Sequence, residues 1–471
     1  MKRSLFAAVL TMVLTASAVH AQVRLLPPAE KPSEEPQKVQ VLPQSLEKSG
    51  VTLIEQPQPE PAAIKPAPVQ PYSPPHQLQG REPAHGKLPG GTAIAPGLQP
   101  PVVQTPALPP PQVCCPTGRA WAEIDYLIWF VEGDHAPALL TTSPTGAPQN
   151  LAGVLGAPGT RTLIGARQFN DDAQSGLRFN VGYWLNPSQT VGIQAGAFWL
   201  ANHDTSSGFV SSGDPILARP YFDTLAKAQS TELIAYPGFS SGSEFVSTHT
   251  SLNGWDVALR QNATCICNGR IDGIVGYRQL RLADQLAVFE EVTSQTTPGP
   301  RGLPAGSQFL AVDRFDTLNE FYGAEFGFLG EYRLNRLVFE GSAKLAAGWN
   351  ISHVNINGAS FITAGGPPSV NTGGLLALPT NIGLIRYSHP TLIPEFGINL
   401  AYDFSNHLRL RGGYNFLYWD QVRRPGQQID TGINPNLIPV AVGGGPVRPL
   451  VSHDETDIFV HGMNFGIEVR Y

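Results

Sequence analysis

The chain has 471 residues, a net charge of −6 and 14% charged residues, where about a quarter is usual. No basic excess points to a nucleic-acid partner, and four cysteines are too few for a disulfide-framed scaffold. Residues 22–113 hold 22 of the 44 prolines and a single aromatic residue, Tyr72, whereas all seven tryptophans follow residue 114. The composition thus separates a proline-rich segment from a large domain rich in glycine and aromatic residues.

The N-terminus has the organisation of a secretory signal. Lys2 and Arg3 precede an apolar run from Leu5 to Leu14, and small residues lead to a cleavage site before Gln22. The alternative is a buried N-terminal strand or helix. We therefore expect a signal peptide over 1–21 and an exported mature chain. No later run of 18 apolar residues predicts a transmembrane helix, so any membrane span must be built from strands.

Residues 22–113 form the proline-rich segment. Its composition cannot bury enough apolar surface to fold alone and favours extended polyproline II. We expect a disordered linker, reaching on the order of 280 Å if fully extended. Its simplest role is that of a solvated spacer. The alternative is a periplasmic tether whose partner is a cell-wall component, for which composition alone gives no support.

Residues 114–471 read as alternating strands. Near the C-terminus Phe465, Ile467, Val469 and Tyr471 alternate with mostly polar or small residues, which is the period of a strand between apolar and polar surroundings. The same alternation predicts ten strands, over 119–131, 176–185, 191–199, 250–261, 269–280, 318–332, 337–349, 395–404, 408–419 and 459–471.

The connections between these strands alternate in length. Short ones fall at 186–188, 265–269, near Asn335 and at 405–407; long ones cover 132–174, 202–248, 289–308, 350–393 and 420–456. A soluble sandwich has no reason to sort its loops in this way, whereas an outer-membrane barrel has short periplasmic turns and long outer loops. We therefore predict an all-β, transmembrane, antiparallel up-and-down barrel of about ten strands (between about 8 and 14), with both chain ends in the periplasm.

Charged residues of the strands fall mostly on the parity that would face the lumen. Ten are basic and ten acidic, and such a balance favours Arg–carboxylate pairs that leave the barrel sealed or open only along a narrow path. The basic residues are Arg119, Arg178, Arg260, Arg270, Arg278, Arg336, Lys344, Arg409, Arg411 and Arg470. The acidic residues are Glu123, Asp125, Asp256, Asp272, Glu325, Glu331, Glu340, Glu395, Asp403 and Glu468. Outward aromatic residues suit interfacial girdles: Trp199, Tyr277, Trp349, Tyr418 and Tyr471.

Several separated motifs resemble one family. They are SGLRFNVGYWL from Ser175 with QTVGI from Gln189, FDTLNEFYGAE from Phe315, and YNFLYW from Tyr414 followed by RPGQQID from Arg424. In this order they are similar to the putative beta-barrel porin-7 family of planctomycete-type bacteria. The resemblance covers roughly residues 119–471. It implies an outer-membrane barrel and brings no catalytic residues with it.

Four cysteines form two pairs on one predicted side of the membrane. Cys114 and Cys115 precede the first strand, and Cys265 and Cys267 lie in a predicted periplasmic turn. Adjacent cysteines bridge each other only with strain, so we expect one or two disulfides between the pairs in the oxidising periplasm. A four-thiolate zinc site is the alternative, although this spacing is unusual for zinc ligands.

Other candidate chemistry is confined to charged pairs at loop ends. Asp171–Asp172, His203–Asp204 and His453–Asp454 could supply a general base to a surface hydrolase, or they could be solvated loop charges. The sequence has no GxSxG, HExxH, P-loop or Rossmann motif in a suitable context. We expect no catalytic residue, no cofactor and no metal site, and hence no enzyme.

Three functions follow from these predictions. The first is a porin or narrow channel for small solutes. The second is a non-conducting barrel that acts through its outer loops and its periplasmic tether, and a loop-borne hydrolase is a distant third. The expected location is the bacterial outer membrane. The expected partners are membrane lipid and, through the C-terminal strand, the barrel-assembly machinery, with no nucleic acid.

Overall fold

The structure is a computed structural model that describes residues 38–39, 118–266, 268–439 and 443–471. The predicted signal peptide, nearly all of the proline-rich segment and Cys114, Cys115 and Cys267 lie outside the described residues. Within those ranges the helical elements are three 3₁₀ turns, η1 (Pro300–Gly302), η2 (Pro425–Gln428) and η3 (Pro435–Leu437). None of the described helices is long or apolar enough to cross a membrane.

Ten antiparallel strands form a closed ring, as the alternating sequence predicts. Each strand pairs with the next of the ten, and the last pairs with the first through Glu123 and Glu468. The strands are β2 (Ala120–Val131), β7 (Ala173–Trp184), β8 (Val191–Leu200), β12 (Ser240–Ile266), β13 (Gly269–Ser294), β14 (Gln308–Leu334), β15 (Leu337–Thr363), β17 (Gly383–Asp403), β18 (Leu408–Val422) and β20 (Thr456–Arg470). The predicted all-β fold with about ten strands is thus confirmed.

Side chains alternate between the two faces of the ring because successive residues of a strand point in opposite directions. On β20, Phe465 and Ile467 are 51% and 42% exposed, whereas Asn464 and Glu468 are buried in the interior. The outward face of every ring strand carries exposed apolar side chains of this kind. Soluble monomers rarely expose a continuous apolar band, so this band requires an apolar environment.

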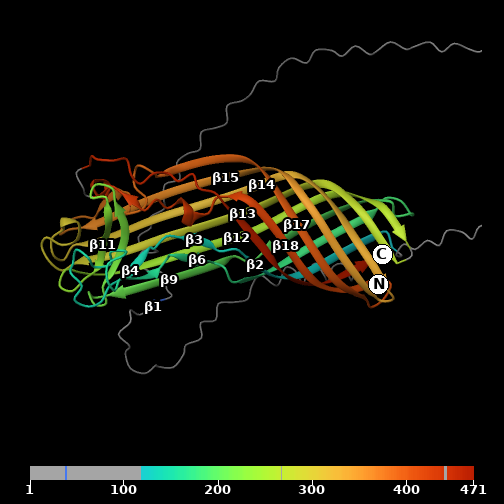
Figure 1. Cartoon of the computed structure of the whole chain (residues 1–471), viewed down its shortest axis with the longest axis horizontal. Helices are drawn as coiled ribbons and strands as arrows, with labels where there is room; N and C mark the ends of the chain where they lie inside the picture. Colours follow the sequence, from blue (N-terminus) through green and yellow to red (C-terminus); the bar gives the residue numbers. More distant parts are fainter. Residues whose placement is uncertain (1–37, 40–117, 267, 440–442) are drawn as a thin grey trace, which may run out of the picture.

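The ring strands differ strongly in length. Strands β12 to β15 have 26 or 27 residues, whereas β2, β7 and β8 have 10 to 12. The long strands, with β17, rise as a tall wall at one end of the ring (Figure 1). The predicted long connections 202–248, 289–308 and 350–393 were therefore partly wrong, because they contain the outer halves of these strands. Polar outward residues such as His249 and Asn355 replace the apolar ones there, so the alternation in hydropathy fades while the backbone stays extended.

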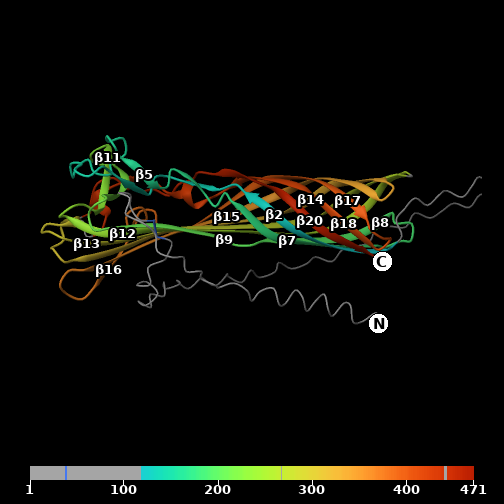
Figure 2. The ribbon, with the colours of Figure 1, turned by 90° about the horizontal axis from the view of Figure 1, so that it is seen from below.

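A second sheet packs on the wall and forms a cap. It contains β4 (Leu140–Thr142), β5 (Arg161–Ile164), β10 (Leu217–Asp223), β11 (Ala228–Ala235) and β19 (Gly432–Ile433). Leu217 and Ile234 of the cap pack in one buried apolar cluster with Val246, Val288 and Phe309 of the wall. Figure 2 shows this cap at the end of the molecule far from the C-terminus. We call that end the cap end, and the opposite end, with Gly118 and Tyr471, the turn end.

Smaller strands complete the cap end. Strands β3 (Asp134–Ala136) and β6 (Arg167–Phe169) pair with each other, and β16 (Ser369–Thr372) pairs with β15. Strand β9 (His203–Ser211) pairs with the outer half of β12. The two described residues of the proline-rich segment, β1 (Lys38–Val39), pair with Phe209 and Gly208 on the other edge of β9. The structure therefore places this piece of the linker at the cap end.

Candidate functional site: the interior of the ring

The interior is built in successive layers, and strand β2 passes through all of them. Its inward residues are Trp121 at the turn end, then Glu123 and Asp125, then Leu127 and Trp129. The neighbouring strand β20 is antiparallel to β2 and has the same layers. Its apolar Ile458 and Val460 lie on the cap side, and Asn464 and Glu468 follow toward the turn end. Along the axis of the ring, from the turn end to the cap end, the inward residues thus change from aromatic to charged to apolar.

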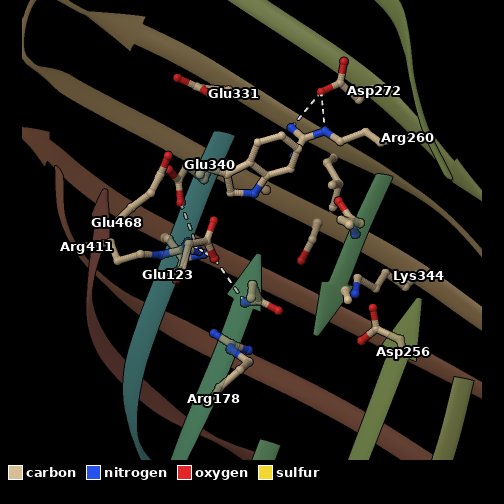
Figure 3. Close-up of a pocket in the computed structure, with 18 of the residues that line it drawn as sticks. Glu123, Arg178, Asp256, Arg260, Asp272, Glu331, Glu340, Lys344, Arg411 and Glu468 are labelled. Atoms are coloured by element: carbon tan, nitrogen blue, oxygen red, sulfur yellow. Dashed lines mark hydrogen bonds and ion pairs between the residues drawn. The ribbon is translucent and has the colours of Figure 1, made fainter. Parts of the chain in front are cut away.

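The charged layer is a network of ion pairs between strands that are not neighbours. Arg409 of β18 contacts Glu331 of β14 at 2.8 Å and Glu340 of β15 at 2.6 Å. Arg411, two residues along β18, lies 2.5 Å from Glu123 of β2 and 3.2 Å from Glu340. Figure 3 shows Arg411, Glu123 and Glu340 converging inside the ring. These arginines connect opposite walls and fill the space between them.

A second group of charges completes this layer on the other side. Arg178 binds Asp125 at 2.7 Å, and Arg278 binds Glu325 at 3.0 Å and also contacts Glu395. Side chains of these pairs are between 0% and 13% exposed. Buried charges are tolerated only when they are paired and hydrogen-bonded, so the near-equal count of acids and bases is what allows them inside.

The structure locates the charges that the sequence assigns to the lumen. Inward positions are occupied by Arg178, Arg270, Arg278, Arg409, Arg411, Glu340, Glu395 and Glu468. Asp403 lies at the turn end, where it pairs with Arg409 at 2.7 Å. Two other expectations were wrong. Arg119 precedes β2 and is exposed beside Tyr183, and Arg336 is exposed in the turn between β14 and β15. Strand parity does not hold at either position because the chain has left the sheet.

Aromatic rings and arginines close the turn end of the interior. Arg260 lies 5.2 Å from the ring centres of both Trp121 and Trp184, and Arg270 lies 4.1 Å from that of Trp184. Trp121 packs directly on Gly182, where any Cβ would overlap the indole. A cavity of about 190 Å³ remains among these residues and the charged layer, and Asp256 and Lys344 also line it (Figure 3).

An apolar layer covers the charged layer on the cap side. It receives inward apolar side chains from every ring strand except β7, whose inward residues at this level are Gly176 and the buried Gln174, and all of the apolar side chains are 0–6% exposed. Its members are Leu127, Trp129, Val131, Phe198, Leu200, Leu252, Leu280, Leu282, Phe321, Ala346, Ile393, Leu417, Trp419, Val422, Ile458 and Val460. A water-filled path through this level would leave some of these side chains exposed to solvent. All of them are buried, so the layer has no such path.

The last two residues of β18 and the segment that follows it cross the interior above the apolar layer. Gln421, with a left-handed φ of 58°, turns the chain inward, and its carbonyl accepts a hydrogen bond from Asn350 of β15 (2.7 Å). Next, the backbone N–H of Arg423 donates to the side-chain oxygen of Asn319 of β14 (2.9 Å). The side-chain amide of Asn319 in turn donates to the backbone carbonyl of Arg423 (2.8 Å). We call residues 421–428 the strap. The sequence predicted only a long loop here, because no periodic pattern marks such a segment.

Two carboxylates hold the far end of the strap. Arg424 is 1% exposed and pairs with Asp284 of β13 at 2.8 Å. The N–H of Gly426 donates to Asp134 at 2.7 Å. Burial raises the pKa of Asp134 to about 6, although Arg424 and the Gly426 N–H oppose that shift. Burial likewise raises the pKa of Asp284 against the effect of Arg424. Both carboxylates therefore hold their charge at an energetic cost.

The predicted loop pairs do not assemble into a catalytic group. Asp204 contacts His249 at 2.6 Å rather than its neighbour His203, and His453 contacts the hydroxyl of Tyr387 at 3.1 Å. Asp171 and Asp172 are exposed at the cap end. In the part of the chain that the structure describes, no three His, Cys, Asp or Glu residues are arranged to hold a metal ion. That the chain is not an enzyme stays a prediction.

The cysteine prediction is also left open. Cys265 is exposed near the end of β12 at the turn end, and the other three cysteines lie outside the described residues. The expected disulfides therefore stay a prediction, which can be tested on the protein itself.

The fold and the interior define a closed antiparallel ring with a charged, filled lumen and an apolar outer band. The family model of Putative beta barrel porin-7 (BBP7) matches residues 121–471, and the chain belongs to this family. The resemblance seen in the sequence is thereby confirmed. No curated protein matches the chain.

The chain has a low similarity to several solved structures. The outer membrane protease OmpT from Escherichia coli has a TM-score of 0.36 at 11% identity, over 75% of this chain and 97% of that one. A Pseudomonas aeruginosa FadL homologue has a TM-score of 0.20 at 6% identity, over 76% and 90% of the two chains. The P. putida toluene transporter TodX has a TM-score of 0.14 at 9% identity, over 76% and 91%.

Proposed function

We propose that the protein is an outer-membrane barrel whose interior is closed and which holds the cap outside the cell. The family assignment and the exposed apolar band support the membrane location. Each of the ten strands pairs with a neighbour on both sides, so the ring has no free edge, which a membrane span built from strands requires. In this orientation the turn end faces the periplasm and the cap end faces the medium, because short turns are periplasmic and long connections are external.

The height of the apolar band fits a bilayer. On β15 the two exposed aromatic residues of the band, Phe339 and Trp349, are ten residues apart. At about 3.3 Å per residue and a tilt of roughly 40°, they are separated by about 25 Å along the ring axis, which is the usual height of such a band. Exposed Trp199, Trp255 and Tyr277 lie at the Trp349 end and support an interfacial girdle there.

The apolar layer is the observation that carries the proposal of a closed interior. Its side chains come from nine of the ten ring strands and are almost completely buried. The strap above it and the ion pairs below it add two further barriers. A barrel closed in this way would act through its cap and its linker, and not through solute flow. The predicted periplasmic tether, with cell-wall components as candidate partners, disagrees with the pairing of Lys38 and Val39 with β9 at the cap end. The C-terminal strand would contact the assembly machinery.

A narrow channel is the second candidate function. The family description and the 190 Å³ cavity, which is lined by both signs of charge, support it. Such a channel would have to displace the strap and separate the apolar layer. We therefore regard the closed state as the resting state in either case.

Conductance of the folded protein in planar bilayers tests this proposal. The sample should first show heat-modifiable mobility on a gel, which reports a folded barrel. We expect no steady current from the native protein over a range of voltage and salt. A steady single-channel current from the native chain would overturn the closed barrel and favour the channel. A general diffusion porin of known conductance, inserted in the same bilayers, provides the positive control.

A further inference from the structure

One arginine attaches the cap to the wall. Arg219 of β10 reaches three carboxylates on three successive wall strands: Glu244 of β12 at 3.3 Å, Glu290 of β13 at 2.9 Å and Asp313 of β14 at 2.7 Å. The four side chains are 0% or 1% exposed. Three acids therefore surround one base in the contact between the cap and the wall.

Asp313 is the carboxylate whose charge is fully compensated. One of its oxygens faces Arg219, and the other accepts hydrogen bonds from the backbone N–H groups of Leu376 (3.2 Å) and Ala377 (2.8 Å). Both oxygens of Asp313 therefore have hydrogen-bond donors. Arg219 and Asp313 thus cancel each other, and the charges of Glu244 and Glu290 remain to be accounted for.

Glu244 and Glu290 lie directly opposite each other in the pairing of β12 with β13. Like charges at such a position destabilise a sheet. Among the described residues, neither oxygen of Glu244 and only one of Glu290 has a hydrogen-bond partner. A buried carboxylate without donors is far more stable when it is protonated.

The other charged groups around this site do not change its balance. Glu232 of β11 and Arg301 of η1 form their own pair at 2.8 Å, so together they add no net charge. Arg219, Asp313, Glu232 and Arg301 are the charged groups that act on Glu244 and Glu290 from the packed elements. With every group ionised, the cluster would hold two uncompensated negative charges away from water.

We propose that Glu244 and Glu290 form a proton-binding site that couples the seating of the cap on the wall to the pH of the medium. With the cap seated, the pair holds at least one proton, which removes at least one of the two uncompensated negative charges of the buried cluster. When the cap lifts, water reaches both carboxylates and the proton leaves to solvent. This coupling goes beyond the proposed function and applies whether or not the barrel conducts.

The titration of the two residues agrees in sign with this geometry. Burial, with repulsion from Glu232, raises the pKa of Glu290 from 4.5 to about 7, and burial raises the pKa of Glu244 well above its ordinary value. A raised acid pKa in the seated state means that seating binds a proton. Seating is then fully favoured below about pH 4.5 and weakens as the pH rises through 7. Coupling to one proton changes the seating equilibrium about tenfold per pH unit within that window.

Hydrogen exchange on the full chain in detergent micelles tests the coupling. We would follow the amides of residues 217–235 in the cap and of 320–334 in the ring between pH 5 and 9, corrected for intrinsic exchange. Opening of the cap should rise about tenfold per pH unit up to about pH 7, while the ring stays protected. Glu244→Gln and Glu290→Gln should each flatten this slope and protect the cap at high pH.

Glu291→Gln is the matched control. Glu291 is next to Glu290 on β13 and faces outward, so its loss should leave the slope unchanged. No pH dependence of the native cap relative to the ring would overturn the proposal. A slope that persists unchanged in both Glu244→Gln and Glu290→Gln would also overturn it. Heat-modifiable mobility of each variant shows independently that the ring has folded.

Discussion

Arg409 and Glu331 form an ion pair of 2.8 Å across the interior of the ring, although β15 and β17 separate their strands along the wall. The guanidinium of Arg409 is 2% exposed and also contacts Glu340 and Asp403. A contact of this kind can form only when the ring is closed and its strands are in register. The ion pair between Arg409 and Glu331 therefore depends both on the inward orientation of each side chain in its own strand and on the closure of the ring.

Removal of Arg409 should destabilise the barrel strongly. Arg409→Met removes a buried cation and leaves the half-buried Glu331, Glu340 and Asp403 without their shared partner, and breaking a buried ion pair costs about 3–5 kcal/mol. We expect a loss of that order in the free energy of unfolding, measured by urea titration of the heat-modifiable band. The control is Arg336→Met in the exposed turn, which should change it by less than about 0.5 kcal/mol. Equal effects of the two variants would contradict an interior role for Arg409.

Truncation of the apolar layer should open a path for ions. Trp419 and Phe321 are both fully buried in the layer. The double variant Trp419→Ala/Phe321→Ala removes two large side chains from it, at a cost of about 3–5 kcal/mol for each. We expect currents in planar bilayers from this variant and none from Trp349→Ala, whose tryptophan faces lipid. A silent, folded double variant would mean that the strap or the charged layer seals the barrel without the apolar layer.

The sequence predicts the ten strands and also indicates the layers of the interior. The ten strands could be predicted because residues such as Phe465 and Ile467 alternate with inward polar ones. The change of the inward face from Glu123 and Asp125 to Leu127 and Trp129 is also visible in the sequence and marks the apolar layer. The ion pairs across the ring could not be predicted, because they depend on register and closure. The strap could not be predicted because its contacts are single hydrogen bonds from an irregular backbone, which leave no periodic pattern in the sequence.

The strap should be held more firmly at acid pH. Burial raises the pKa of Asp134 from 3.8 to about 6, so the folded state binds a proton that the unfolded state loses. Stability conferred by this residue is therefore greatest below pH 3.8 and falls as the pH rises to about 6. Across that window the loss is on the order of 3 kcal/mol.

The variant Asp134→Asn isolates this titration. Its amide oxygen can still accept the hydrogen bond from Gly426, but the side chain does not ionise. We expect its unfolding free energy, relative to that of the native chain, to rise between pH 4 and 7. Asp172→Asn, an exposed acid on the same side of the ring, should show no such change. A constant difference between Asp134→Asn and the native chain would contradict the buried, costly charge at Asp134.

A disulfide at the turn end should be visible on gels. Cys265 is exposed there, and the first strand of the ring begins at the same end. We expect the double variant Cys265→Ser/Cys267→Ser to abolish any shift in mobility between reduced and non-reduced samples, because every predicted disulfide joins one of these two residues to Cys114 or Cys115. Thiol titration of the unmutated protein after denaturation should then give fewer than four free thiols. Four free thiols and unchanged mobility would exclude the disulfide.

The side of the membrane on which the linker lies can be decided by labelling. The proposed tether places residue 38 in the periplasm, whereas the pairing of Lys38 with Phe209 places it at the cap end. A sealed interior offers no route between the two. In a background with the four cysteines changed to serine, we expect Lys38→Cys to react with an impermeant maleimide only after the outer membrane is permeabilised. Ala226→Cys, in the exposed turn between β10 and β11, should react in intact cells. Labelling of Lys38→Cys in intact cells would instead place the linker outside and contradict the periplasmic tether.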